Sequence, residues 1–120
     1  MKIALVKPDN ISDHIQPSIG LGILTNLLRN NGHKVYLLDF LKLKFNRRKL
    51  KEFIDIEQPD IIGFQCYTFD IFKVKDYAEF IKQNFSNIKI ILGGPHPTTL
   101  PEETLDFFEN LIDYIFLSEA

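Results

Sequence analysis

The chain has 120 residues, of which 45% are hydrophobic and 25% charged, and its formal net charge is −2. This composition is typical of one globular domain with a single core, and the small negative charge excludes a bulk attraction to nucleic acid or to an anionic membrane. Cys66 is the single cysteine, which excludes an intrachain disulfide and a cysteine-bound cluster within the chain. The apolar run Ile3–Val6 is too short for a secretory signal or a membrane span, so we expect a cytoplasmic domain.

Short apolar runs alternate with amphipathic segments along the whole chain. Five strands are predicted, in chain order, at Lys2–Val6, Val35–Leu38, Ile61–Gln65, Ile88–Leu92 and Tyr114–Leu117. The first helix is predicted to begin at Pro17, where a missing N–H costs nothing, and to end at Gly32, which favours a left-handed cap. A second helix is predicted over Arg47–Glu57. A third is indicated by the apolar spacing of Val74, Tyr77, Ala78, Ile81 and Phe85, and a fourth by the capping pattern Thr99–Glu102.

Strands that alternate with helices predict an α/β fold with a parallel sheet. Right-handed crossovers and five strands favour the strand order 2-1-3-4-5, a flavodoxin- or Rossmann-like three-layer sandwich. Its switch point falls between the first and third strands. The crevice is then lined by the loops after Val6, Gln65 and Leu92, which is where ligands bind in open parallel sheets.

Three functions of this fold are excluded by residue type. A phosphoryl-accepting receiver needs an Asp after the third strand and a Lys after the fifth, but Gln65-Cys66 and Leu117-Ser118 occupy those positions. Flavin-phosphate binding needs a glycine- and hydroxyl-rich loop after the first strand, and Lys7–Gln16 holds no glycine. A dinucleotide fingerprint is absent from the same loop. The sequence also offers no convincing nucleophile or acid–base pair, so we assign no catalytic residue.

Several stretches together resemble a known family: Pro17-Ser18-Ile19-Gly20-Leu21-Gly22, Gly32-His33-Lys34-Val35, Pro59-Asp60-Ile61-Ile62-Gly63, Gly93-Gly94-Pro95-His96-Pro97-Thr98 and Leu117-Ser118-Glu119-Ala120. The combination resembles the amino-terminal cobalamin (vitamin B12)-binding domain of radical S-adenosylmethionine proteins, along essentially the whole chain. Ser118 replaces the Gly of the signature that closes this domain. The resemblance implies that cobalamin lies across the carboxyl edge of the sheet, with its nucleotide tail in a groove beside the first helix.

The same resemblance implies roles for particular residues. Pro17, Ser18 and Gly20 would line the groove at the first helix, and Gly93 and Gly94 would let the cofactor pass close to the backbone. The remaining implied contacts are with the ring, from Tyr67 and Thr68, and with the tail, from His96 and Thr98. From the residues alone, His96 between two prolines is better explained as a loop-shaping residue that bonds the backbone than as a ligand.

One departure concerns the lower ligand of the cobalt. Relatives of the methionine-synthase and mutase type carry Asp-x-His-x-x-Gly after the first strand, whereas here Asp13 and His14 are adjacent and no Gly follows at that spacing. His14 is therefore a poor axial ligand, and we predict no metal ligand from this chain. Radical enzymes of the family often bind cobalamin without a protein ligand, so the departure is compatible with the resemblance.

The sequence supports two hypotheses that belong to different functional classes. The first is a cobalamin-binding module that presents cobalamin to a downstream radical S-adenosylmethionine catalytic domain. In one variant of this hypothesis, the cobalamin carries a methyl group. That domain would carry the [4Fe–4S] cluster and S-adenosylmethionine, which a chain with one cysteine does not supply. The second is a cofactor-free domain of the same fold that acts as a docking or substrate-interaction scaffold. In both cases residues 1–120 are expected to be one domain of a longer chain, because the sequence stops soon after an apolar strand.

Overall fold

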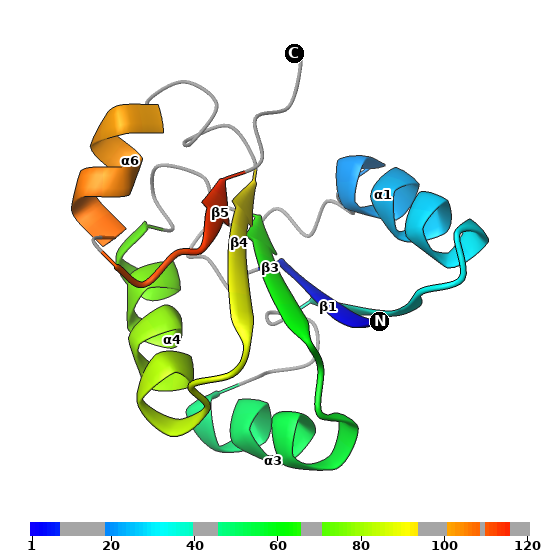
Figure 1. Ribbon diagram of the computed structural model, residues 1–120, viewed down its shortest axis with the longest axis horizontal. Helices are drawn as coiled ribbons and strands as arrows, with labels where there is room; N and C mark the ends of the chain where they lie inside the picture. Colours follow the sequence, from blue (N-terminus) through cyan, green and yellow to red (C-terminus); the bar gives the residue numbers. More distant parts are fainter. Residues whose placement is uncertain (8–18, 40–45, 66–70, 94–100, 109, 116–120) are drawn as a thin grey trace.

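A computed structural model describes residues 1–7, 19–39, 46–65, 71–93, 101–108 and 110–115 of the chain (Figure 1). Strands and helices alternate along it. In chain order they are β1 (Lys2–Lys7), α1 (Ile19–Asn30), β2 (Lys34–Asp39), α3 (Arg47–Glu57), β3 (Ile61–Gln65), α4 (Ile71–Asn84), β4 (Lys89–Gly93), α6 (Pro101–Phe108) and β5 (Tyr114–Ile115). The predicted α/β class is confirmed, and the predicted helix over Arg47–Glu57 matches α3 at both ends.

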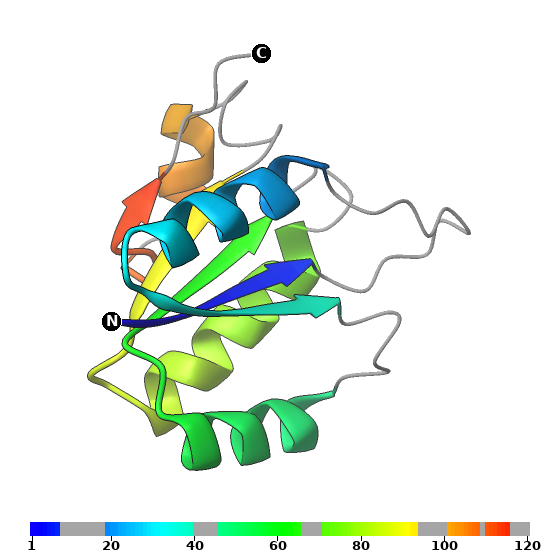
Figure 2. The same cartoon turned by 90° about the vertical axis from the view of Figure 1, so that its right-hand side faces the viewer.

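All strand pairs of the sheet are parallel, and their order is β2-β1-β3-β4-β5. Since β1 has β2 on one side and β3 on the other, the chain reverses its direction of travel across the sheet between β1 and β3. This is the predicted switch point. The strands point the same way in Figure 2, so their carboxyl ends share one edge of the molecule.

Of the predicted fifth strand, the structure describes Tyr114 and Ile115, which form β5. Four strands of five or six residues, in the order 2-1-3-4, form the body of the sheet, and β5 adds the pairs Ile91–Tyr114 and Leu92–Ile115. Just before β5, Asp113 bonds Ile90 twice: its N–H donates to Ile90 O at 2.9 Å, and its Oδ2 accepts the Ile90 N–H at 2.8 Å. Residues 116–117 of the prediction lie outside the described part of the chain.

Helices lie on both faces of the sheet, with α3, α4 and α6 on one side and α1 on the other (Figure 1). The alternation of side chains along the strands divides the core accordingly. The larger cluster packs under α3, α4 and α6 and includes Ala4, Val6, Leu38, Ile62, Phe64, Ile90, Leu92 and Phe108. The smaller cluster lies under α1 and consists of Ile3, Leu5 and Val35, with Leu28 and Ile61 packed against it.

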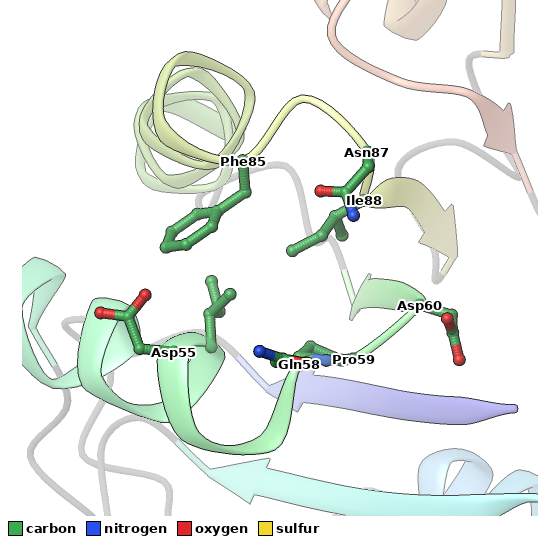
Figure 3. Close-up of a pocket in the computed structure, with 8 residues that line it drawn as sticks. Asp55, Gln58, Pro59, Asp60, Phe85, Asn87 and Ile88 are labelled. Atoms are coloured by element: carbon green, nitrogen blue, oxygen red, sulfur yellow. The ribbon is translucent and has the colours of Figure 1, made fainter.

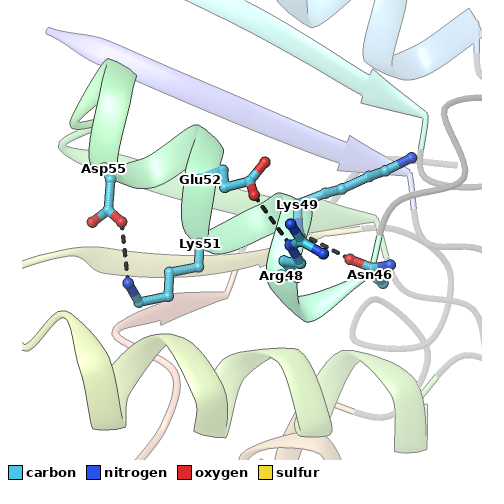
Figure 4. A network of polar contacts seen from close by, with 6 residues as sticks. All are labelled: Asn46, Arg48, Lys49, Lys51, Glu52 and Asp55. Atoms are coloured by element: carbon cyan, nitrogen blue, oxygen red, sulfur yellow. Dashed lines mark hydrogen bonds and ion pairs between the residues drawn. The ribbon is translucent and has the colours of Figure 1, made fainter.

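Helix α3 shows how a strongly charged segment is held on the sheet. The side chain of Asn46 caps its start by accepting the Lys49 N–H, and its two buried residues are Leu50 and Ile54. Its exposed side carries the pairs Arg48–Glu52 and Lys51–Asp55, each one helical turn apart (Figure 4). Arg48 and Lys51 are thus matched by carboxylates one turn away, as expected for a solvated helix face, and Arg47 pairs with Asp76 of α4.

The turn from α1 into β2 joins the two elements tightly. Gly32 has φ +86°, a left-handed conformation that favours glycine, and its N–H donates to Arg29 O as predicted for a helix cap. The Arg29 guanidinium then reaches back to β2, where Nη2 donates to Val35 O at 2.8 Å. Lys34 N donates to the carbonyl oxygen of Met1, the residue before β1, so the neighbouring Val35 carbonyl points away from β1, toward the outer edge of the sheet.

Candidate functional site

The carboxyl ends of β1, β3 and β4 lie side by side. The register pairs Val6 with Phe64 and Gln65 with Gly93, so Lys7, Gln65 and Gly93 end three neighbouring strands at the same level. With strands about 4.8 Å apart, this edge is about 10 Å wide from β1 to β4. It is also where the strand order reverses, which is the usual position of a ligand crevice in an open parallel sheet.

Small and polar groups replace the apolar ones at this edge. Lys7, Gln65 and Gly93 all belong to the α1 side of the sheet, because each follows a residue of that side by two positions. All three are half-buried, and the side-chain oxygen Oε1 of Gln65 is buried. An ammonium, an amide and a bare stretch of backbone therefore meet where the sheet ends. Beside them, Asp39 ends β2 at the level of Lys7.

The packing beneath this edge is dense. Phe64, next to Gln65, is buried and stacks on Tyr77 of α4 with ring centroids 6.4 Å apart and planes at 15°. One step further down β3, a Cβ added to Gly63 would lie 3.1 Å from Leu5 Cδ2, closer than ordinary contact. The ends of β1 and β3 are thus held on a closely packed support, and this fixes the distance between the loops that follow them.

Of the predicted site residues, two lie within the described chain. Gly20 is in the first turn of α1 and Gly93 is the last residue of β4; both elements meet the carboxyl edge at these ends (Figure 2). The other predicted residues, Pro17, Ser18, Tyr67, Thr68, Gly94, His96 and Thr98, lie outside the described residues, as do His14 and Cys66. Their roles therefore remain predictions.

Sequence reasoning missed Lys7 and Gln65 as members of this edge. The sequence predicts Lys7 in the loop after the first strand, whereas β1 continues through it and pairs it with Asp39. For Gln65 the sequence predicts the end of a central strand. The position of Gln65 in the strand is the signal that could have identified it. Gln65 follows Gly63 by two residues and so lies on the same face of the sheet, and a polar side chain there indicates where the core under that face ends.

The opposite edge of the sheet carries a surface pocket of about 360 Å³ (Figure 3). It lies where α3 and α4 end, and its lining residues are Ile54, Asp55, Gln58, Pro59, Asp60, Phe85, Asn87 and Ile88. Asp60 also accepts the Lys2 N–H at 2.9 Å, which ties β1 to the start of β3. This pocket is separated from the candidate site by the length of the strands.

Groups that would hold a bare metal ion are missing from the described residues, where no cluster of three or more His, Cys, Asp or Glu side chains occurs. The described helices also include none that is long and apolar enough to cross a membrane.

The model of the B12-binding domain family matches residues 12–120. The chain belongs to this family. An uncharacterized methyltransferase of Pyrococcus horikoshii, PH0819, is 30% identical over 111 residues, which are 88% of this chain and 24% of that protein. The chain spans between 13% and 24% of the length of the curated relatives that it matches.

Solved structures share the fold at lower identity. The radical S-adenosylmethionine methyltransferase TsrM of Kitasatospora setae, with cobalamin and a [4Fe–4S] cluster bound, superposes with a TM-score of 0.76 at 19% identity, over 89% of this chain and 22% of that one. A CheY-like protein, TadZ of Pseudomonas aeruginosa, superposes with a TM-score of 0.68 at 11% identity, over 98% of this chain and 87% of that one. Proteins of different kinds thus share this fold. The assignment of the chain to the B12-binding family therefore rests on the family match and not on the fold.

Proposed function

We propose that this chain binds cobalamin across the carboxyl edge of its sheet, as the cobalamin-binding module of a radical S-adenosylmethionine methyltransferase. The observation that carries the proposal is the meeting of the β1, β3 and β4 ends at the switch point, in a chain that belongs to the B12-binding family. Cobalamin is a broad ligand rich in amide groups, and a polar edge about 10 Å wide suits it.

The residues at this edge fit such a ligand. Gly93 ends β4 without a side chain, which leaves its backbone open to close approach. Beside it, the amide of Gln65 and the ammonium of Lys7 are donors for the carbonyl groups around a corrin ring. When bound, cobalamin supplies a cobalt centre that can carry a methyl group; the part of this chain is to hold and orient the ring.

Further contacts are assigned to residues of the surrounding loops. We place Pro17, Ser18 and Gly20 along the groove for the nucleotide tail, together with Gly94, His96 and Thr98 after β4. Tyr67 and Thr68 follow β3 and are assigned to the ring. The catalytic chemistry is assigned to a separate downstream domain that holds the [4Fe–4S] cluster and S-adenosylmethionine. This is supported by relatives that are several times longer than the matched region.

Titration with hydroxocobalamin tests the proposal. The purified chain should change the visible spectrum of the cofactor and retain its colour through desalting. Gly93→Leu should weaken binding tenfold or more, because the new side chain fills the edge. Gly32→Ala is the matched control: it also adds bulk at a glycine, but at the opposite edge of the sheet, and should leave the affinity unchanged.

An unchanged spectrum and loss of all colour on desalting would contradict cobalamin binding and favour the cofactor-free scaffold. Equal affinities of the Gly93→Leu and Gly32→Ala chains for hydroxocobalamin would show that the cofactor does not bind at the carboxyl end of β4. The assignment to a methyltransferase is tested separately, by iron and sulfide analysis of the polypeptide isolated from its source. A chain without a [4Fe–4S] cluster contradicts that part alone.

A further inference from the structure

Lys7 is the charged residue among the three that end β1, β3 and β4 at the carboxyl edge. The register places it beside Gln65, which in turn pairs with Gly93, and all three belong to the α1 side of the sheet. Lys7 is half-buried at this position. Its ammonium group therefore belongs to the candidate site itself and not to an outer surface of the domain.

The strand β1 determines the side of the sheet to which Lys7 belongs. Ile3 and Leu5 precede Lys7 at intervals of two residues, and both are buried in the cluster under α1. Because side chains alternate between the two faces of a strand, the side chain of Lys7 extends on the side of α1. Val6 belongs to the opposite face and is buried in the larger cluster. Lys7 thus offers its charge to a ligand group that lies on the α1 side.

Lys7 and Gln65 are not equivalent as hydrogen-bonding groups. The amide of Gln65 is neutral and both donates and accepts hydrogen bonds, whereas the ammonium of Lys7 has three N–H donors and a full positive charge. Either group can donate to a carbonyl oxygen of a ligand. A half-buried ammonium gains most from an acceptor of opposite charge, because Coulomb attraction then adds to the hydrogen bond. The ligand group that Lys7 distinguishes from others is therefore an anion.

Helix α1 adds to the positive potential on the same side of the sheet. The first turn of this 12-residue helix contains no acidic residue. The amino end of a helix carries a partial positive charge from its unpaired N–H groups, and this end of α1 meets the carboxyl edge (Figure 2). The charge of Lys7 and that of the helix end therefore have the same sign and favour the same kind of ligand group.

The acidic residue at this level lies on the border strand of the sheet. Asp39 ends β2 and pairs with Lys7, whereas β3 lies on the other side of β1 and places the neutral Gln65 there. The candidate site lies over β1, β3 and β4, which is the side of Lys7 away from Asp39. An anionic group that approaches between β1 and β3 thus meets the ammonium and the amide before it reaches β2.

We propose that Lys7 recognises the phosphodiester of cobalamin and thereby selects the complete cofactor over corrinoids that lack the nucleotide tail. The proposal deepens the proposed function and rests on it. The amide groups around the corrin ring are neutral, and the phosphodiester that joins the ring to the nucleotide is the one anionic group on the periphery of the cofactor. Since the tail is assigned to the α1 side, its charge lies on the side to which Lys7 extends. Lys7 is thus a specificity-determining residue of this site.

Three corrinoids that share the ring test this assignment. They are hydroxocobalamin, cobinamide phosphate, which lacks the nucleoside, and cobinamide, which lacks the phosphate as well. Spectroscopic titration measures their affinities for the chain. The unchanged chain should bind cobinamide phosphate more tightly than cobinamide. Lys7→Met should weaken the binding of hydroxocobalamin and of cobinamide phosphate about tenfold, because a charge-assisted hydrogen bond is lost, and should change the affinity for cobinamide less than about twofold.

Two further variants separate the charge of Lys7 from other effects of its replacement. Lys49→Met is the matched control, because Lys49 is an exposed lysine of α3 on the other side of the sheet, and it should leave all three affinities unchanged. Lys7→Arg keeps the charge and should retain the preference for cobinamide phosphate over cobinamide. Urea unfolding of each variant checks that the domain remains folded. Added salt should weaken hydroxocobalamin binding by the unchanged chain more than by Lys7→Met, because salt screens the ion pair.

Equal losses of affinity for cobinamide and cobinamide phosphate in Lys7→Met would overturn the proposal, because a contact with the ring would then explain the loss. Unchanged binding of hydroxocobalamin by this variant, or equal affinities of the unchanged chain for cobinamide and cobinamide phosphate, would overturn it as well. In these cases the unchanged chain still binds corrinoids, so the proposed function stands. Failure of the unchanged chain to bind any of the three corrinoids would contradict the proposed function and this proposal with it.

Discussion

Lys82 of α4 lies 2.8 Å from the carboxylate of Asp113, the residue that immediately precedes β5. The same carboxylate oxygen accepts the Ile90 N–H, also at 2.8 Å, and the Lys82 ammonium additionally donates to Ile88 O at 3.0 Å. Both side chains are half-buried within the described chain. One carboxylate therefore joins α4, β4 and the start of β5.

Removal of this carboxylate should destabilise the domain. Asp113→Ala leaves the Lys82 ammonium and the Ile90 N–H without their acceptor, and we expect a loss of about 2 kcal/mol in the free energy of unfolding. Urea denaturation measures this loss. Asp106→Ala on the exposed side of α6 is the control and should change the free energy by less than about 0.5 kcal/mol. Equal effects of the two substitutions would show that the joint contributes nothing.

The stability contributed by Asp113 should depend on pH. Partial burial raises the pKa of Asp113, but the Lys82 hydrogen bond, the Ile90 N–H and the charges of Lys82 and Lys89 together lower it below its ordinary value of 3.8. The folded state therefore releases this proton more readily than the unfolded state. The contribution is complete above about pH 4 and is lost as the pH falls through the lowered pKa.

The stability difference between the unmodified chain and Asp113→Asn should accordingly shrink as the pH is lowered from 5 to 3. The measurement is a series of urea unfolding curves across this range. The Asp106→Asn chain, measured in parallel, corrects for the general titration of carboxylates. A difference that stays constant over the whole range would show that the Asp113 carboxylate is not the group responsible.

Removing the glycine at the end of α1 and introducing one at the end of α3 should have opposite effects on the free energy of unfolding. Gly32 and Gln58 both have positive φ, +86° and +49°, but only one of them is a glycine. Gly32→Ala should destabilise the domain by about 1 kcal/mol, and Gln58→Gly should stabilise it by a similar or smaller amount. Thermal or urea unfolding measures both. Since the space around a Cβ at Gly32 is open, a loss there reports backbone strain alone.

Gly63 should tolerate no larger side chain while Leu5 is present. The built Cβ lies 3.1 Å from Leu5 Cδ2, so Gly63→Val should cost about 1–3 kcal/mol of stability by overpacking. Leu5→Ala removes the clashing atom, and the double variant should therefore be more stable than the sum of the two single losses predicts. A double-mutant cycle measures this coupling. Strict additivity would contradict the steric explanation.

The cobalt of bound cobalamin should receive no ligand from this chain. His14 lacks the motif spacing of an axial ligand. Cob(II)alamin bound to uniformly ¹⁵N-labelled protein should show the same nitrogen hyperfine splitting as with unlabelled protein in electron paramagnetic resonance. A splitting that changes on labelling, and reverts in His14→Ala, would identify His14 as the ligand.

Much of the fold follows from local signals in the sequence. Val74, Tyr77, Ala78 and Ile81 recur at helical spacing, and all four are buried in α4 as predicted. The cap at Gly32 follows from a conformation that glycine favours. In these places the local preference of the chain and the final packing agree, so periodicity and residue type suffice.

The features that sequence reasoning missed depend on distant partners. Asp113 meets Lys82 and Ile90 across 31 and 23 residues, and no local pattern indicates which strand an isolated carboxylate will bond. Likewise, Tyr114 lies in an apolar run that predicts a strand, but its 63% exposure depends on its place on the border strand of the sheet. Most predicted site residues lie in loops outside the described chain, where their roles remain predictions.

The contact between Arg29 and Val35 has a consequence for how the domain behaves at high concentration. β2 is a border strand of the sheet, and the Val35 carbonyl faces outward where a foreign strand could pair with it. The guanidinium of Arg29 occupies that acceptor and places a positive charge beside it. A polypeptide extending the sheet from this border would have to displace the arginine first, so the contact protects the domain against edge-to-edge aggregation.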